Sequence, residues 1–289
     1  MTLSRSARAY GFALLTYVLF SSHDAIVKVL VADISVFQII FYESLFGLIP
    51  LIIMMLMDKN TGNFRPRHPW LMAIRTGLNL IALSSVFYAF GQLPLAEAYA
   101  LIFATPLLIT ALSVPILSEK VGVFRWVAVV VGLVGVLVVL RPGVQALSLG
   151  HLAALTSAIA SALSVIILRK VGNVERSAVM IIIPTLAGIV VMAFILPWVY
   201  VPVSLPTLGA LAIAGALIVS AQLTMIGAYR AASSAAAIAP VQYTQILWAT
   251  LFGVLFFDEI PDGWLAVGAA IIIGSGLFVA WRESRASKA

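Results

Sequence analysis

Apolar runs of about twenty residues recur along the whole chain and decide what it can fold into. The stretch from Trp126 to Leu140, for example, contains no charged residue and does not alternate apolar with polar positions, as a transmembrane β-strand would. A helix needs about 20 mostly apolar residues to cross a hydrocarbon layer of about 30 Å. Of the 289 residues, 63% are hydrophobic and 10% are charged, against about 25% charged in an average soluble domain. We therefore expect an all-α membrane protein.

Ten segments of the chain are long and apolar enough to span a membrane. The first follows Arg5 and Arg8 as a secretory signal would, but it is too long for an h-region and lacks a convincing cleavage site. We therefore keep it as a mature helix. The predicted spans are residues 9–31, 35–57, 68–91, 94–117, 121–140, 147–169, 177–199, 206–230, 234–257 and 262–281.

The positions of Lys and Arg predict the orientation, because cytoplasmic loops retain positive charge. With ten spans, Lys28 and Arg141 fall on one side and Arg75 falls inside the third span. All other basic residues fall on the opposite side: Arg5, Arg8, Lys59, Arg65, Arg67, Lys120, Arg125, Arg169, Lys170, Arg176, Arg230, Arg282, Arg285 and Lys288. Both termini are thus predicted to be cytoplasmic, in a multi-pass protein of the bacterial inner membrane. This topology explains the net charge of +6 without a nucleic-acid partner.

A weak internal repeat divides the chain into two halves. The stretch LLITALSVPILSE at Leu107 to Glu119 aligns without gaps on LWATLFGVLFFDE at Leu247 to Glu259, at an offset of 140 residues. Five spans per half is an odd number, so the second half must enter the membrane from the opposite side. We therefore expect a 5+5 inverted repeat, with residues 1–143 as the first half and 144–289 as the second. Many secondary transporters have this architecture, in which equivalent halves expose a central site alternately to each side.

Several classes of function are excluded or left without support. The chain has no cysteine, and His23, His68 and His151 lie far apart in sequence, so no metal site and no cofactor is predicted. Short loops leave no room for a catalytic or ATP-hydrolysing domain, and no phosphate-binding or hydrolase motif occurs. We therefore expect no enzyme. The partners predicted are the lipid bilayer and a small-molecule substrate, and monomer and homodimer stay open.

Three stretches carry a family resemblance. These are FSSHDAIVKVL at Phe20 to Leu30, LPLAEAYALIFATPLLITALSVPILSEKVGVFRWVAVVVGLVGVLVVLRPG at Leu93 to Gly143, and PVQYTQILWATLFGVLFFDEIP at Pro240 to Pro261. The chain resembles the ten-helix, EamA-type branch of the drug/metabolite transporter superfamily, and is similar to bacterial amino-acid exporters of the YddG type. The resemblance implies transport of small metabolites. It also shows a departure, because many relatives carry Arg in the second span where this chain has Glu43.

The candidate substrate site is mostly uncharged. Tyr99 lies in the fourth span, and Gln242, Gln245 and Trp248 lie close together in the ninth, which is the equivalent span of the other half. Pro106 and Pro240 should bend these two spans and free backbone carbonyls near the membrane midplane. Ser85 and Tyr88 of the third span complete the set. For each residue, hydrogen bonding between packed helices is an equally good explanation.

Ionisable residues inside the spans are costly and therefore need a role. His23, Asp24 and Glu43 are candidates for proton or charge coupling, and Asp24 with neighbouring His23 is also a candidate for contact with a substrate amine. The competing interpretation is an intrahelical pair between Asp24 and Lys28, which are four residues apart. Arg75 has two interpretations, reaching back to lipid phosphate or binding a substrate carboxylate, and we favour the first. For Glu119 and Glu259, at helix ends, we expect a loop or capping role.

These observations predict a secondary transporter that moves small metabolites out of the cell by alternating access. Amino acids, including aromatic and other apolar ones, are the expected substrates. The alternative from a different class is a membrane-embedded scaffold or sensor that binds a ligand without moving it.

Overall fold

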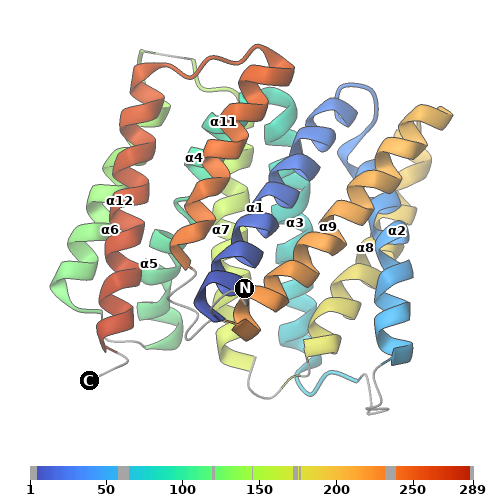
Figure 1. Cartoon of the computed structure of the whole chain (residues 1–289), viewed down its shortest axis with the longest axis horizontal. Coiled ribbons are helices and arrows are strands. Elements are labelled where there is room, and N and C mark those ends of the chain that lie inside the picture. The colour runs from blue at the N-terminus through green and yellow to red at the C-terminus, as the bar shows by residue number, and fades with distance from the viewer. Residues whose placement is uncertain are drawn as a thin grey trace.

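In the computed structural model the chain is a bundle of long helices that run roughly side by side (Figure 1). The structure describes residues 5–57, 65–118, 121–144, 146–171, 175, 177–231 and 239–286. All regular elements within these ranges are helices, which confirms the all-α prediction. In chain order they are α1 (Arg5–Leu30), α2 (Val36–Met57), α3 (Pro69–Gln92), α4 (Leu95–Ile102), α5 (Thr105–Leu117), α6 (Val123–Leu140), α7 (Leu149–Val171), α8 (Ser177–Val199), α9 (Leu205–Ala231), η1 (Ala239–Tyr243), α11 (Thr244–Phe257) and α12 (Gly263–Ala286).

The helix lengths agree with the ten predicted spans. Eight stretches of the described chain are long and apolar enough to cross a membrane, and α4 with α5 counts as one of them. Two shorter apolar stretches, Val36–Ile49 and Val241–Phe257, correspond to the second and ninth spans. The start of the predicted ninth span lies partly outside the described residues.

The fourth and ninth spans are each broken once. The α4 helix ends at Ile102, and α5 begins at Thr105 with Pro106 in its first turn. At the break, the Ala104 N–H donates to Leu101 O, a tighter turn than the α-helix makes. In the ninth span, η1 contains Pro240 and passes directly into α11 at Thr244. Proline lacks a backbone N–H and disfavours helical geometry in the residue before it, which accounts for irregular backbone at both places.

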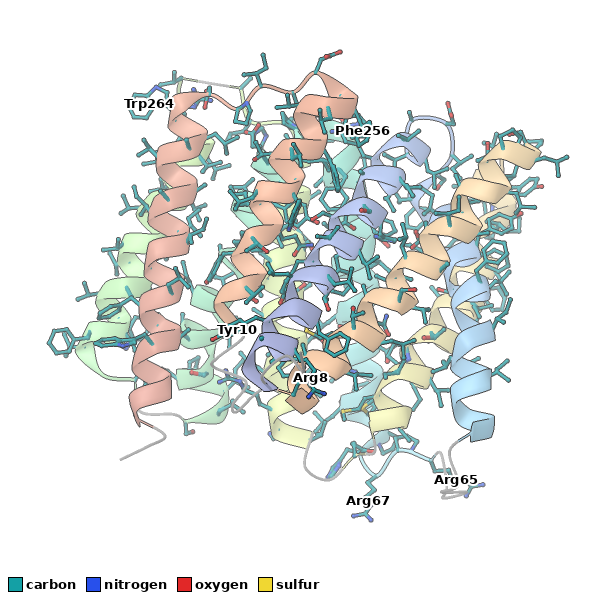
Figure 2. The ribbon with its side chains drawn as sticks, viewed as in Figure 1. Arg8, Tyr10, Arg65, Arg67, Phe256 and Trp264 are labelled. Atoms are coloured by element: carbon teal, nitrogen blue, oxygen red, sulfur yellow. The ribbon has the colours of Figure 1, made fainter. Side chains whose placement is uncertain are left out.

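The ends of the bundle differ in composition. The start of α1 and the end of α12 lie toward the same end (Figure 1), which we call the basal end. Arg8, Arg65 and Arg67 lie there, whereas Trp264 and Phe256 lie at the opposite, distal end (Figure 2). Successive spans alternate in direction between the two ends.

Four helix pairs make the main contacts of the bundle: α1 with α9, α3 with α7, α6 with α12, and α2 with α8. The closest approach of α6 and α12 involves two glycines. A Cβ atom added at Gly135 would lie 3.0 Å from Gly268 O, and one added at Gly268 would lie 2.9 Å from Gly135 O. Small residues of this kind let membrane helices pack backbone against backbone.

Candidate functional site

A cavity of about 460 Å³ lies between α2, α3, α8 and α9. Its polar lining residues are Glu43, Ser44, Asn79, Thr185 and Gln222, and most of the others are aliphatic. This size and this mixture, mostly apolar with a few polar groups, are typical of a site for a small organic ligand.

The cavity extends from the middle of the bundle toward the basal end. Glu43 lies in the second turn of α2, whose first residue is at the distal end. Ile181 and Pro184 lie in the first two turns of α8, which starts at the basal end. The lining thus runs from the distal part of α2, which contains Glu43, to the basal part of α8.

Behind Glu43, a buried histidine bridges two carboxylates. The His23 side chain is 2% exposed, with Nε2 lying 3.0 Å from Glu43 Oε1 and Nδ1 lying 2.7 Å from Asp24 Oδ1. Glu43 itself is only 8% exposed. The three residues predicted as candidates for charge coupling thus form one hydrogen-bonded unit between α1 and α2.

This unit continues across the bundle to α11. The Tyr99 hydroxyl of α4 donates to Asp24 Oδ2, and Gln245 Nε2 of α11 donates to the Tyr99 hydroxyl at 2.7 Å. Glu43, His23, Asp24, Tyr99 and Gln245, here called the polar chain, therefore join α2, α1, α4 and α11 in series. Tyr99 and Gln245, both named as candidates for the substrate site, are hydrogen-bonded to each other.

The other predicted substrate contacts lie outside this arrangement. Ser85 is half-buried on α3, Tyr88 is 37% exposed on the same helix, and Gln242 is half-buried in η1. None of them lines the cavity. Trp248 does not line it either, but its indole Nε1 is buried and has no hydrogen-bond partner in the described part of the chain. The assignment of these four residues to substrate stays a prediction.

Lys28 corrects one of the two interpretations of the first span. It forms an ion pair with Glu259 at 2.7 Å, and it donates to Phe90 O at 2.8 Å and Leu93 O at 2.6 Å. The intrahelical pair between Lys28 and Asp24 is therefore wrong. The physical reason is the proline at position 94, since its missing N–H leaves Phe90 O without a helical partner and the ammonium group takes that place.

Glu259 has the capping role that was expected, but for a helix of the other half. Its Oε2 accepts the backbone N–H of Leu95, the first residue of α4, at 2.9 Å. The carboxylate thus neutralises Lys28 and satisfies an N-terminal amide of α4 at once. Glu119, its counterpart in the repeat, lies outside the described residues.

Further polar contacts tie the distal ends of the helices together. Arg141 Nη2 lies 2.6 Å from Asp262 Oδ2, and Glu97 Oε1 of α4 lies 3.0 Å from His151 Nε2 of α7. The backbone N–H of Leu265 holds the pKa of Asp262 below its usual value; burial opposes this, and the Arg141 guanidinium adds to the lowering. Together with Lys28, these contacts join the two halves of the chain at its distal end.

Arg75 lies nearer the basal end and binds neither a carboxylate nor a residue of its own helix. Its Nη1 donates to Met180 O of α8 at 3.1 Å. The helical partner of that carbonyl would be residue 184, which is Pro184 and has no N–H to offer. The described residues give Arg75 this additional contact, and the two interpretations stay predictions.

Among the described residues, no group of three or more His, Asp or Glu is placed to hold a metal ion. Sequence reasoning missed the cavity between α2, α3, α8 and α9, and with it Ser44, Asn79 and Thr185. The available signal was that each is an uncharged polar residue in an otherwise apolar helix. That signal is weak, because such residues often serve helix packing alone.

Comparisons with known proteins support the fold and a relation to transporters. Residues 7–141 match the EamA-like transporter family. The chain is 28% identical over 281 residues to an S-adenosylmethionine uptake transporter of Rickettsia bellii, covering 96% of this chain and 94% of that protein. It is 28% identical over 228 residues to a riboflavin transporter of Rhizobium johnstonii, covering 76% and 73% of the two chains. One crystal structure has the same fold, with a TM-score of 0.66 and 21% identity over 97% of this chain and 99% of the other.

Proposed function

Because residues 7–141 match the EamA-like transporter family and the described chain contains helices able to cross a membrane, we propose that it is a multi-pass transporter of this family, which moves a small metabolite across the membrane by alternating access. The observation that carries the proposal is the cavity, whose carboxylate end joins a polar chain that crosses from the first half to α11 of the second. A solute that contacts Glu43 can thereby act on contacts between the halves. A passive scaffold has no need for such a connection.

The proposal includes the inverted repeat, with its halves at residues 1–143 and 144–289. Support comes from the two broken spans, because α5 begins at Thr105 and α11 begins at Thr244, 139 residues apart and so within one residue of the 140-residue offset. The C-caps of α5 and α11, Ser118 and Asp258, share the same offset and the same left-handed backbone, with φ of 56° and 55°. Helix pairing also fits, since α1 with α9 and α7 with α3 are equivalent pairs under exchange of the halves.

The distal end is the closed end in this conformation. Lys28 with Glu259, Arg141 with Asp262 and Glu97 with His151 join the halves there, while the cavity extends toward the basal end. The arginines at the basal end favour a cytoplasmic location for it, and with it for both termini. In the proposed cycle these distal contacts break when the cavity opens to the other side.

The proposed substrates are amino acids and related small amphipathic metabolites, moved outward. The relatives named for S-adenosylmethionine and riboflavin widen the substrate panel, and both names concern uptake or transport rather than amino-acid export. Within the polar chain we propose that His23, Asp24 and Glu43 carry charge coupling. Tyr99, Gln245 and Trp248 are proposed to contact substrate, with Gln242, Ser85 and Tyr88 around them.

Flux through liposomes that contain only the purified protein tests the proposal. Preloaded amino acids, S-adenosylmethionine and riboflavin are exchanged against labelled compound from either side. We expect saturable exchange of at least one of them, faster when a pH gradient is imposed. Ligand binding without flux of any compound in either direction would instead show a sensor or scaffold.

Trp248 provides a test of the substrate site itself. We expect Trp248→Ala to raise the half-saturating concentration of substrate by roughly 5- to 150-fold, about 1 to 3 kcal/mol, because the ligand loses its apolar contact with the indole and a hydrogen-bond donor. Trp264→Ala is the matched control, since Trp264 is 60% exposed at the start of α12. An unchanged half-saturating concentration with a lowered melting temperature would make Trp248 a packing residue.

A further inference from the structure

The cavity contains a single ionisable side chain among its described lining residues. That residue is Glu43, in the second turn of α2. The polar lining residues beside it, Ser44, Asn79, Thr185 and Gln222, are uncharged. No basic residue of the described chain lines the cavity, so this lining offers an anionic ligand no counter-charge.

Glu43 belongs to a unit whose net charge follows from its hydrogen bonds. His23 is bonded through both ring nitrogens to carboxylates, to Glu43 on one side and Asp24 on the other. Each of these two bonds contains one proton, whichever of its two atoms holds it. An imidazole ring and two carboxylates that hold these two protons and no other carry a net charge of −1. The donation from Tyr99 to Asp24 leaves this sum unchanged.

The neighbouring cations do not cancel this charge. Lys28 is one turn from Asp24 on α1, but its charge is matched by Glu259, and its other donors go to Phe90 O and Leu93 O. Arg75 keeps its own charge, but it donates to Met180 O of α8 and not to Glu43 or Asp24. Glu43 and Asp24 have His23 as their ion-pair partner, and His23 is already counted. A net negative charge within the membrane is costly, so a positive group beside Glu43 would be favoured.

The rest of the cavity suits an apolar body attached to that positive group. Leu80 and Leu83 of α3 and Ile218 and Val219 of α9 line it. Its volume, about 460 Å³, is within the usual range for small organic ligands. Apolar contact supplies affinity in such a site, and a few polar groups set the orientation.

We propose that this cavity selects solutes that carry a cationic group, held at Glu43, on an apolar body held between α3 and α9. Amines and other organic cations should bind in preference to neutral or anionic molecules of the same shape. The inference rests on the proposed transport function, because it names the charge class of the substrate for that site.

Three probes of nearly one shape test the charge preference. They are 2-phenylethylammonium, 2-phenylethanol and phenylacetate, titrated by calorimetry at pH 7 into the full-length protein in detergent. We expect the ammonium ion to bind at least about tenfold more tightly than the alcohol, which is about 1.4 kcal/mol. Phenylacetate should bind more weakly than the alcohol.

Three variants identify the group responsible. Glu43→Gln should bring the ratio between ammonium and alcohol below about threefold, because the amide keeps the size but loses the charge. Glu43→Asp, which keeps the charge, should retain the preference. Gln222→Ala, an uncharged change in the same lining, should weaken ammonium and alcohol alike. Melting temperatures of all variants show whether each has folded.

Several outcomes would overturn the inference. They are equal affinity for ammonium and alcohol in the parent protein, no binding of the ammonium at about 10 mM, or an unchanged ratio in folded Glu43→Gln protein. Because the assay measures binding in detergent, its result is separate from flux. Selective binding without flux would contradict the transport proposal and support the charge preference. Flux of neutral or anionic solutes alone would support the transport proposal and contradict the charge preference.

Discussion

Lys28→Met should release the distal closure of the bundle. Methionine keeps the length and apolar stem of the side chain but loses the three donor contacts to Glu259, Phe90 O and Leu93 O. The side chains of Lys28 and Glu259 are 12% and 18% exposed, so the pair is largely withdrawn from water. Loss of one partner from a buried pair costs about 3 to 5 kcal/mol. With allowance for the residual exposure, we expect about 2 to 3 kcal/mol against the closed form.

An energy of about 2 to 3 kcal/mol changes the ratio of open to closed forms by roughly 30- to 150-fold. A cysteine in place of Ala249 reports this change, because Ala249 is fully buried beside Glu259 in a small distal pocket and the chain has no native cysteine. An impermeant thiol reagent should label Ala249→Cys slowly in the parent background and faster with Lys28→Met. Glu259→Gln should raise the rate similarly.

The double variant makes this prediction sharper. If the ion pair is what holds the end closed, adding Glu259→Gln to Lys28→Met should give much less than the sum of the two single effects. Additive effects would mean that the two residues act independently. An unchanged labelling rate in folded Lys28→Met protein would refute the reasoning altogether.

Three shorter predictions concern topology, packing and pH. A single Leu147→Cys should react with an impermeant reagent outside intact cells and Arg67→Cys should not, because basic loops stay cytoplasmic; the reverse pattern would invert the orientation. Gly268→Ala should lower the melting temperature, since the added Cβ would lie 2.5 Å from a side-chain atom of α6 and 2.9 Å from a backbone oxygen. Gly274→Ala, with nothing within 4 Å of the added Cβ, should leave the melting temperature unchanged or raise it. Equal effects of the two variants would contradict the close contact between α6 and α12. Burial raises the pKa of Glu175, but backbone and ring hydrogen bonds around position 68 lower it by more, so the net shift is downward. The contribution of Glu175 to stability should therefore be present near pH 7 and disappear as the pH falls through the lowered pKa. The melting temperatures of the parent and Glu175→Gln should converge in acid, and a difference that stays constant with pH would contradict this role.

The architecture was predictable because the membrane leaves few choices. Runs of about twenty apolar residues must be helices, since each backbone group needs an internal partner in hydrocarbon. Pro106 and Pro240 also indicated the two irregular spans, because proline cannot continue the helical hydrogen-bond pattern. Both inferences depend on local chemistry alone, and both agree with the described helices.

The side-chain partners were harder to predict. Spacing on one helix suggested Asp24 as the partner of Lys28, but Glu259 lies more than two hundred residues away and occupies that place. The predicted substrate site joined the fourth and ninth spans, and there Tyr99 and Gln245 do meet. The cavity lies instead between four other helices. Which helices enclose a cavity depends on tertiary packing, and a single sequence contains no direct signal of that.

The cations on α1 and α3 have a consequence for how this sequence can vary. Lys28 occupies the carbonyl that Pro94 leaves unpaired, and Arg75 occupies the one that Pro184 leaves unpaired. If the cation alone is replaced, the carbonyl oxygen is left buried without a hydrogen-bond donor. If the proline alone is replaced, the new backbone N–H competes with the cation for the same carbonyl oxygen. The two residues of each pair should therefore be kept or replaced together, so that among relatives Lys28 covaries with Pro94 and Arg75 with Pro184.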